Sequence, residues 1–263
     1  MWPSATIALR FEKFPFSIYL IISTPLKYVA HCLGYLSSLS LICGCASDEI
    51  NPTTEKTEGA QYYPLTVGRY AIYNVEDIRY TVRDGVDTIQ YQLREQITDS
   101  WMGAGGEIIY SLERSTRNSE ENNWRVDSVW TARKNERAVI VVENNVPYVK
   151  LLFPFSDALT WDGNALNSAP EQTYQLTVTD STLRQKIGST WADQMENSWT
   201  VVQRQLETLV NDSVLTETYA PKLGLLYKET RILHYCADDD CIGQKQITSG
   251  RSYRQTLLTY GEN

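Results

Sequence analysis

Histidine and basic side chains are scarce in this chain of 263 residues. One of the two histidines, His31, lies in a segment with the features of an export signal, so the mature protein keeps only His234 and a multi-histidine metal site is excluded. Residues 1 to 44 carry three of the 24 Lys and Arg and one of the 32 Asp and Glu, which leaves 21 against 31 and a net charge near −10. Nucleic acid is therefore disfavoured as a partner, because a phosphate backbone needs a basic face.

Motifs of several enzyme classes are also missing. No Gly-x-Ser-x-Gly turn accompanies His234, and a single histidine in a strand is usually structural. The glycine-rich stretch Gly103 to Gly106 is not followed by Lys-Ser or Lys-Thr, so it predicts a turn rather than a phosphate-binding loop. Catalysis by paired carboxylates needs two acids, and the 31 acids of the mature chain single out no pair. We therefore expect neither a cofactor nor a resident metal ion.

The sequence also lacks an uninterrupted apolar stretch of about 20 residues, the length that a membrane-spanning helix needs, and contains only a shorter one. Tyr28 to Ile42 follows a lysine and runs into Ile42-Cys43-Gly44-Cys45, the order of a secretory signal and its cleavage site. These four residues resemble a bacterial lipobox, except that Cys43 stands where Ala, Ser or Thr is usual. The resemblance implies that Cys45 becomes the first mature residue and carries acyl chains such as palmitate, which anchor a protein without a spanning helix. The alternative is a transmembrane helix, which a histidine and several serines within the stretch disfavour.

Residues 1 to 25 do not fit such a signal, which normally starts a few residues before the apolar stretch. Leu26 lies at that distance, and we hypothesise that translation starts there from a rare start codon. The alternative is an unusually long signal with a second apolar patch, Phe14 to Ile22. Residues 45 to 61 are polar and predict a flexible tether. The acidic pair Asp48-Glu49 resembles the surface-export signal of Bacteroidota-type lipoproteins, with a plain solvated linker as the alternative.

Residues 62 to 263 predict a single β-rich domain, because polar and apolar residues alternate with period two. The runs 78–82 and 89–94 flank Asp84-Gly85 and predict an antiparallel hairpin. Further strands are expected at 174–178, 199–209, 214–219, 223–235 and 253–260, with turns at Asn211-Asp212 and Ser249-Gly250.

Helical patterns are weak throughout this domain. No segment of ten or more residues has an amphipathic stripe, and only Ser156 to Leu159 and Ser181 to Lys186 are expected to hold one short helix each. The predicted fold class is therefore all-β: an antiparallel curved sheet, half-barrel or barrel-like, with at most one or two short helices. A sandwich is the alternative.

Two cysteines near the C-terminus enclose three aspartates. Cys236 and Cys241 are expected to form a disulfide at a hairpin tip, since an exported protein meets an oxidising compartment. The bridge closes a short loop and is expected to contribute at the low end of about 2 to 4 kcal/mol. A Ca2+ site at Asp238 to Asp240, and a zinc site that joins His234 to the two thiols, are weaker alternatives because both sets are short of ligands.

Two further segments carry apolar surface. Trp161, Asp162 and Asn164 lie in an expected loop, where an aromatic ring is able to stack on a sugar or dock a partner. Packing of that ring against the sheet is the favoured alternative. Val146 to Phe155 is an apolar run that contains two prolines, and it predicts either a concave lipid-binding face or a buried strand.

A family resemblance rests on Tyr62 to Tyr70 (YYPLTVGRY) and Tyr219 to Glu229 (YAPKLGLLYKE). Together with residues 161–164 and the cysteine loop, these stretches resemble a group of uncharacterised Bacteroidota-type outer-membrane lipoproteins. The resemblance implies an outer-membrane location, periplasmic or surface-facing, and no activity. Pro64 and Gly68 are expected to set the entry into the first strand, and Pro221 with Gly224 to bend the chain between two later strands.

We therefore expect a lipid-anchored, non-catalytic envelope protein that acts as a scaffold or binds an envelope protein, a small hydrophobic ligand or a glycan. A carrier or sensor of a hydrophobic ligand is the first alternative, and it predicts a continuous lining of Tyr, Leu and Val. A secreted hydrolase with paired carboxylates is the second, and it predicts a deep cleft with two acids at catalytic separation.

Overall fold

A computed structural model describes residues 59–83, 85–181, 191 and 196–263. The chain divides into two units, Met1–Ile50 and Asn51–Asn263, and all described residues belong to the second. The export signal, Cys45 and most of the expected tether lie outside the described residues. One turn of 3-10 helix, η1 (Ala60–Tyr62), precedes the strands. The strands are β1 (Arg69–Thr81), β2 (Gly85–Met102), β3 (Ile108–Arg117), β4 (Arg125–Lys134), β5 (Ala138–Glu143), β6 (Val146–Leu152), β7 (Thr160–Asp162), β8 (Thr173–Val178), β9 (Trp199–Glu207), β10 (Asn211–Ala220), β11 (Gly224–Tyr235) and β12 (Ile247–Glu262).

All twelve strands belong to one antiparallel sheet with the order β6-β5-β4-β3-β2-β1-β12-β11-β10-β9-β8-β7. Consecutive strands pair with each other apart from β6 and β7, and β1 also pairs with β12. The predicted hairpin is present, with Thr81 paired to Gly85 across its turn. The all-β, antiparallel prediction is therefore confirmed.

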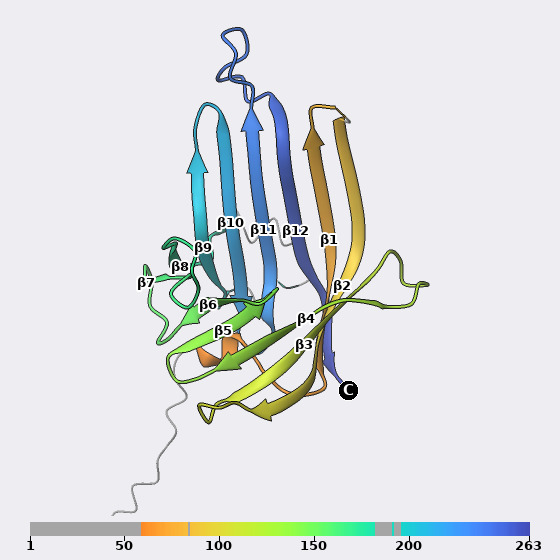
Figure 1. Cartoon of the computed structure of the whole chain (residues 1–263), viewed down its shortest axis with the longest axis vertical. Helices are drawn as coiled ribbons and strands as arrows, with labels where there is room; N and C mark the ends of the chain where they lie inside the picture. Colours follow the sequence, from red (N-terminus) through yellow and green to blue (C-terminus); the bar gives the residue numbers. More distant parts are fainter. Residues whose placement is uncertain (1–58, 84, 182–190, 192–195) are drawn as a thin grey trace, which may run out of the picture. The chain divides into compact units, whose positions relative to one another are not determined.

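The sheet curls until its two edge strands, β6 and β7, approach each other (Figure 1). Val149 of β6 donates its N–H to the carbonyl oxygen of Gly163 at 3.0 Å, and the indole N–H of Trp161 donates to the carbonyl oxygen of Val149 at 2.8 Å. We call the contact between β6 and β7 the seam. Glycine is required at position 163 of the seam because a Cβ there would lie 2.2 Å from the ring of Tyr174. These contacts bring the sheet close to a barrel.

The segment before β1 packs across one end of the barrel. Lys134 of β4 donates from its ammonium group to the carbonyl oxygens of Ala60 and Tyr63, both at 2.9 Å. The ring of Tyr62 lies 4.9 Å from that of Phe155, centroid to centroid. Lys222, in the turn after β10, donates its N–H to the carbonyl oxygen of Gln61 at 2.8 Å. The segment before β1 therefore contacts both β4 and the turn after β10, and it covers this end of the barrel.

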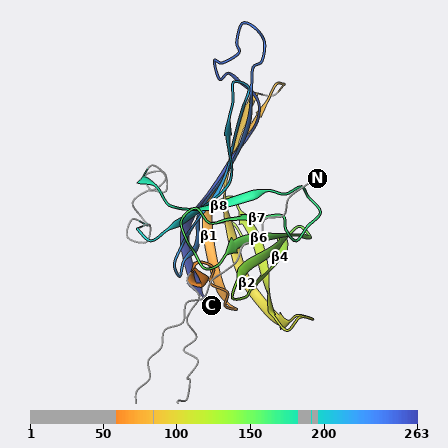
Figure 2. The same ribbon diagram turned by 90° about the vertical axis from the view of Figure 1, so that its left-hand side faces the viewer.

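The molecule has two regions of different construction. In the closed half, buried side chains from β4 to β10 form a continuous apolar core that includes Leu151, Leu176 and Val201. Beyond it, β1, β2 and β9–β12 continue as a single layer, which we call the extension (Figures 1 and 2). The extension comprises residues 77–81, 85–90, 204–207, 211–215, 230–235 and 247–253 with their connecting turns. Its tip exposes apolar side chains, among them Val82, 85% exposed.

Four local predictions are wrong. Trp161 and Asp162, expected in a loop, belong to β7, because they pair with β8. Ser156 to Leu159 forms a turn and no helix, because the backbone of Ala158 and Leu159 hydrogen-bonds with Leu176 of β8. Asn211-Asp212 is not a turn but begins β10. The turn lies at 208–210, where the Thr208 hydroxyl accepts the backbone N–H groups of Val210 and Asn211. The second expected helix, from Ser181 onward, falls almost wholly outside the described residues.

The turn expected at Ser249-Gly250 is also wrong, since both residues lie inside β12. Gly250 has φ +135°, and a Cβ there would lie 2.3 Å from the carbonyl oxygen of Ile232. Glycine is needed because β12 passes so close to β11, and not because the chain turns. The connection between these strands is the cysteine loop, residues 236–246.

Candidate functional site

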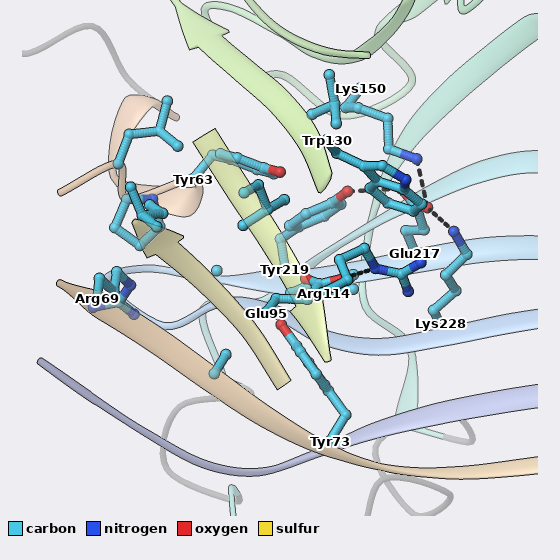
Figure 3. A pocket seen from close by; sticks show the side chains of 18 of the residues that line it. Tyr63, Arg69, Tyr73, Glu95, Arg114, Trp130, Lys150, Glu217, Tyr219 and Lys228 are labelled. Carbon is cyan, nitrogen blue, oxygen red and sulfur yellow. Dashed lines mark hydrogen bonds and ion pairs between the residues drawn. The ribbon is translucent and has the colours of Figure 1, made fainter. Parts of the chain in front are cut away.

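A cavity of about 80 Å³ lies inside the closed half of the domain (Figure 3). Nine strands and the segment before β1 supply its lining, so residues far apart in the sequence meet there. A polar cavity of this size holds several water molecules or a small polar group. The lining residues are Tyr63, Pro64, Leu65, Arg69, Tyr70, Ala71, Tyr73, Glu95, Ile97, Leu112, Arg114, Trp130, Val141, Glu143, Lys150, Glu217, Tyr219, Leu223, Gly224, Leu225, Lys228 and Gln255.

Glu217 of β10 is the centre of an ion-pair network on the cavity wall. Its Oε1 atom lies 2.6 Å from the Nζ atom of Lys150 and 2.9 Å from that of Lys228. Its Oε2 atom accepts the hydroxyl of Tyr219 at 2.6 Å. Lys150 reaches across from β6 and also lies 3.0 Å from Glu143. The network therefore joins the two halves of the curled sheet.

Glu217 and Lys150 keep their charges although burial disfavours the ionised form of both. Burial alone would raise the pKa of Glu217, but attraction from Lys150 and then Lys228, with hydrogen bonds from Lys150 and Tyr219, holds it well below its usual range. Burial would likewise lower the pKa of Lys150, and the charges of Glu217 and Glu143 raise it instead. Both groups are therefore ionised at neutral pH, although an ion pair at such depth gains little net stability.

A second ion pair also lines the cavity. Arg114 of β3 donates from Nε to Glu95 of β2 at 3.0 Å, and its guanidinium carbon lies 3.9 Å from the ring centroid of Trp130. Burial acts to lower the pKa of Arg114, but the charge of Glu95, its hydrogen bond and further nearby groups together raise it above its usual value. The guanidinium is thus fixed between a carboxylate and an aromatic face.

Two hydrogen-bond donors on the lining have no partner among the described residues. They are the side-chain amide nitrogen Nε2 of Gln255 and the indole nitrogen Nε1 of Trp130. Gln255 is 1% exposed, and its Oε1 atom accepts the hydroxyl of Tyr253 at 2.8 Å, so only the amide donors are left over. An unpartnered buried donor costs about 1 to 3 kcal/mol. The pair therefore indicates that an acceptor belongs in the cavity.

Neither alternative function finds its expected site in this cavity. Glu143 and Glu217 both contact Lys150, but a glycosidase acid needs a raised pKa, and that of Glu217 is lowered. The lining is also not the continuous Tyr, Leu and Val surface expected of a hydrophobic carrier, because seven charged side chains interrupt it.

An open groove of about 740 Å³ lies elsewhere on the sheet. It is polar, and its described donors and acceptors are bonded to one another in several places: Gln90 donates to Glu76, which also pairs with Arg254. The lining residues are Asn74, Val75, Glu76, Gln90, Tyr91, Gln92, Asn118, Ser119, Glu120, Tyr227, Arg254 and Thr256. None of the unpartnered buried donors found among the described residues lies in it.

The sequence-predicted binding residues lie at the seam and not at the cavity. Trp161 is 8% exposed, and its ring packs edge-on against Tyr174 at 5.9 Å. Asp162 accepts the backbone N–H groups of Asn164 and Gln172, and the buried Asn164 side chain donates to Pro170. Val146 to Phe155 contains β6 followed by two buried phenylalanines. Both segments pack in the core.

The cysteine loop lies at the tip of the extension. Cys236 and Cys241 are joined in a disulfide, with Cα atoms 5.8 Å apart. Asp238, Asp239 and Asp240 are exposed. His234 is exposed too, and its Nδ1 atom lies 2.7 Å from the side-chain oxygen of Asn211.

Comparisons with known proteins find a distant structural likeness. No protein-family model and no curated protein sequence matches the chain. A solved structure from Bacteroides fragilis NCTC 9343, titled a "putative exported protein with YmcC-like fold", is similar with a TM-score of 0.36 and 10% sequence identity. The match covers 76% of this chain and 99% of the other. Within the part of the chain that the structure describes, no helical segment has the length and apolar character of a membrane span.

Proposed function

We propose that this protein is an exported, lipid-anchored envelope protein that binds a small ligand in the cavity of its curled sheet and catalyses no reaction. The observation that supports binding most strongly is the cavity itself, where buried ion pairs surround two unpartnered donors. Burial of so many charges costs stability, and such clusters are typical of functional sites. The absence of a raised carboxylate pKa at Glu217 supports binding without acid catalysis.

The anchor part of the proposal rests on the sequence. Ile42-Cys43-Gly44-Cys45 resembles a lipobox, and the chain after it is polar before the domain begins. Two or three acyl chains on Cys45 would hold the domain at a membrane surface, because each buried CH2 group contributes about 0.8 kcal/mol. We place the protein at the outer membrane, facing the periplasm or the surface.

Each part has its own experiment. Metabolic labelling with an alkyne analogue of palmitate is expected to label the wild type and not Cys45→Ser, and label retained by the variant would contradict the anchor. For binding, thermal unfolding of the full chain in detergent is measured against amino acids, short carboxylic acids, monosaccharides and phosphate. A saturable rise in the midpoint with at least one class is expected, since a ligand of the folded state alone stabilises it. A flat response to every class would contradict binding in the cavity.

A further inference from the structure

We infer that the cavity binds a small carboxylate, whose oxygen atoms accept hydrogen bonds from Gln255 and Trp130. This inference rests on the proposed binding function and names the chemistry of the ligand. It follows from three properties of the lining: its unused hydrogen bonds, its charge and its size.

The unused hydrogen bonds are all donors. The acids of the lining are engaged: Glu95 with Arg114, Glu143 with Lys150, and Glu217 with two lysines and Tyr219. The unpartnered atoms on the lining are N–H groups, one from Trp130 and the amide group of Gln255. A ligand that completes this site must therefore supply acceptors, and an ammonium or guanidinium group supplies none.

The charge of the lining has an excess of one cation. Four cationic side chains, Arg69, Arg114, Lys150 and Lys228, face three acids. Arg69 is the surplus, because its Nη2 atom donates to the neutral carbonyl oxygens of Lys222 and Leu223. The nearest acid, Glu262, lies 3.8 Å away with a largely exposed side chain. A single negative charge on the ligand would balance the lining.

Size and the remaining wall distinguish a carboxylate from other anions. The cavity of about 80 Å³ is large enough for a group of a few heavy atoms. Ile97, Leu112, Val141 and Leu225 supply apolar surface beside the charges. Phosphate carries more than one charge and has no apolar part to contact these side chains, whereas a short alkyl carboxylate matches both.

The test titrates acetate, propionate and butyrate into the full-length protein in detergent. Binding is followed by calorimetry and by tryptophan fluorescence, which Trp130 reports from the cavity wall. Acetamide, methylammonium chloride, phosphate and sodium chloride serve as probes of matched size or ionic strength. Saturable binding of the carboxylates, at least tenfold tighter than that of acetamide, is expected. Equal affinity for acetamide, or tighter binding of phosphate, would overturn the carboxylate assignment and leave the proposed binding function standing.

Gln255→Leu and its matched control, Gln203→Leu, connect binding to the donors. The Nε2 atom of Gln203 is also a buried donor without a described partner, but it does not line the cavity. Gln255→Leu is expected to raise the Kd for propionate at least tenfold, and Gln203→Leu to leave it within twofold. Trp130→Phe, which removes the other N–H, provides the same test if Gln255→Leu does not fold. Unchanged affinity in both cavity variants would overturn the inference.

A series from butyrate to octanoate separates two sources of the carboxylate. If affinity falls for acids longer than butyrate, the natural ligand is a free short-chain acid. If affinity rises steadily to octanoate, the bound carboxylate is the head group of a longer fatty acid whose chain leaves the cavity. If no carboxylate binds saturably, the inference fails, and the proposed binding function is then decided by the wider set of amino acids, monosaccharides and phosphate in the thermal-unfolding test.

Discussion

The closed half and the extension place the same kinds of charged pair in opposite surroundings. In the closed half, Glu217 and Lys150 are buried and Lys228 is partly exposed. In the extension, Asp77 is covered mainly by Arg79 and Arg251, whose side chains remain half exposed. A single layer leaves water beside every arginine, so these pairs are screened. We therefore expect the burial of the cations, and not the type of pair, to decide how much such a pair contributes to stability.

The largest effect is expected from removing Glu217. Glu217→Ala leaves the buried Lys150 and the partly exposed Lys228 without their shared partner, and breaking a buried pair in this way costs about 3 to 5 kcal/mol. Denaturant unfolding of the purified protein measures the loss. In a double-mutant cycle, Lys150→Met made in the Glu217→Ala background should recover part of this loss of unfolding free energy. A loss below 1 kcal/mol would mean that the closed half does not differ from the extension.

A smaller change is expected from acid, and it acts through the same carboxylate. The folded-state pKa of Glu217 lies below its usual value of 4.5, so its contribution is present above about pH 4.5 and is lost as the pH falls through the folded pKa. The wild type should therefore lose unfolding free energy below pH 4.5 more steeply than Glu217→Gln, which has no proton to gain. Parallel pH profiles for the two proteins would show that Glu217 is not held ionised.

Next in size is the disulfide at the tip of the extension. The bridge spans five residues of sequence, and loop-closure entropy assigns it about 2 kcal/mol. The double variant Cys236→Ser/Cys241→Ser should lose about that much, and dithiothreitol should lower the wild-type midpoint toward that of the variant. The variant itself controls for other effects of the reductant. A wild-type midpoint that reductant leaves unchanged would show that the tip does not limit unfolding.

The sequence predicts the two regions unequally well. Strands of the extension alternate cleanly, so β9–β11 are predicted close to their observed positions, and parts of β1, β2 and β12 are predicted although these strands are longer than their alternating runs. In the closed half, β8 also alternates and is predicted well. The strands β3, β4, β5 and β7 were missed. In β5, buried residues follow one another without alternation, because both faces are covered in the closed half. Period two is informative only where one face meets water.

The cavity was missed for a related reason. Alternation separates two faces of a strand, but it does not say that a polar side chain on the buried face belongs to a site. Glu95 stands between Leu93 and Ile97, and Gln255 between Tyr253 and Leu257, each on an otherwise apolar face. Lys150 interrupts the apolar run from Val146 to Phe155 in the same way. These interruptions were the available signal, and their meeting point depends on strand order, which alternation does not contain.

The smallest effect is expected from Arg251→Ala in the extension. Arg251 contacts both carboxylate oxygens of Asp77, at 2.6 and 3.0 Å, yet half of its side chain is exposed. Arg79 remains 3.1 Å from the same carboxylate, so Asp77 keeps a cation when Arg251 is removed. The loss of unfolding free energy should be at most about 1 kcal/mol and should shrink further at high salt. A loss as large as that of Glu217→Ala would mean that a second layer covers this face in solution, because only a buried pair responds so strongly.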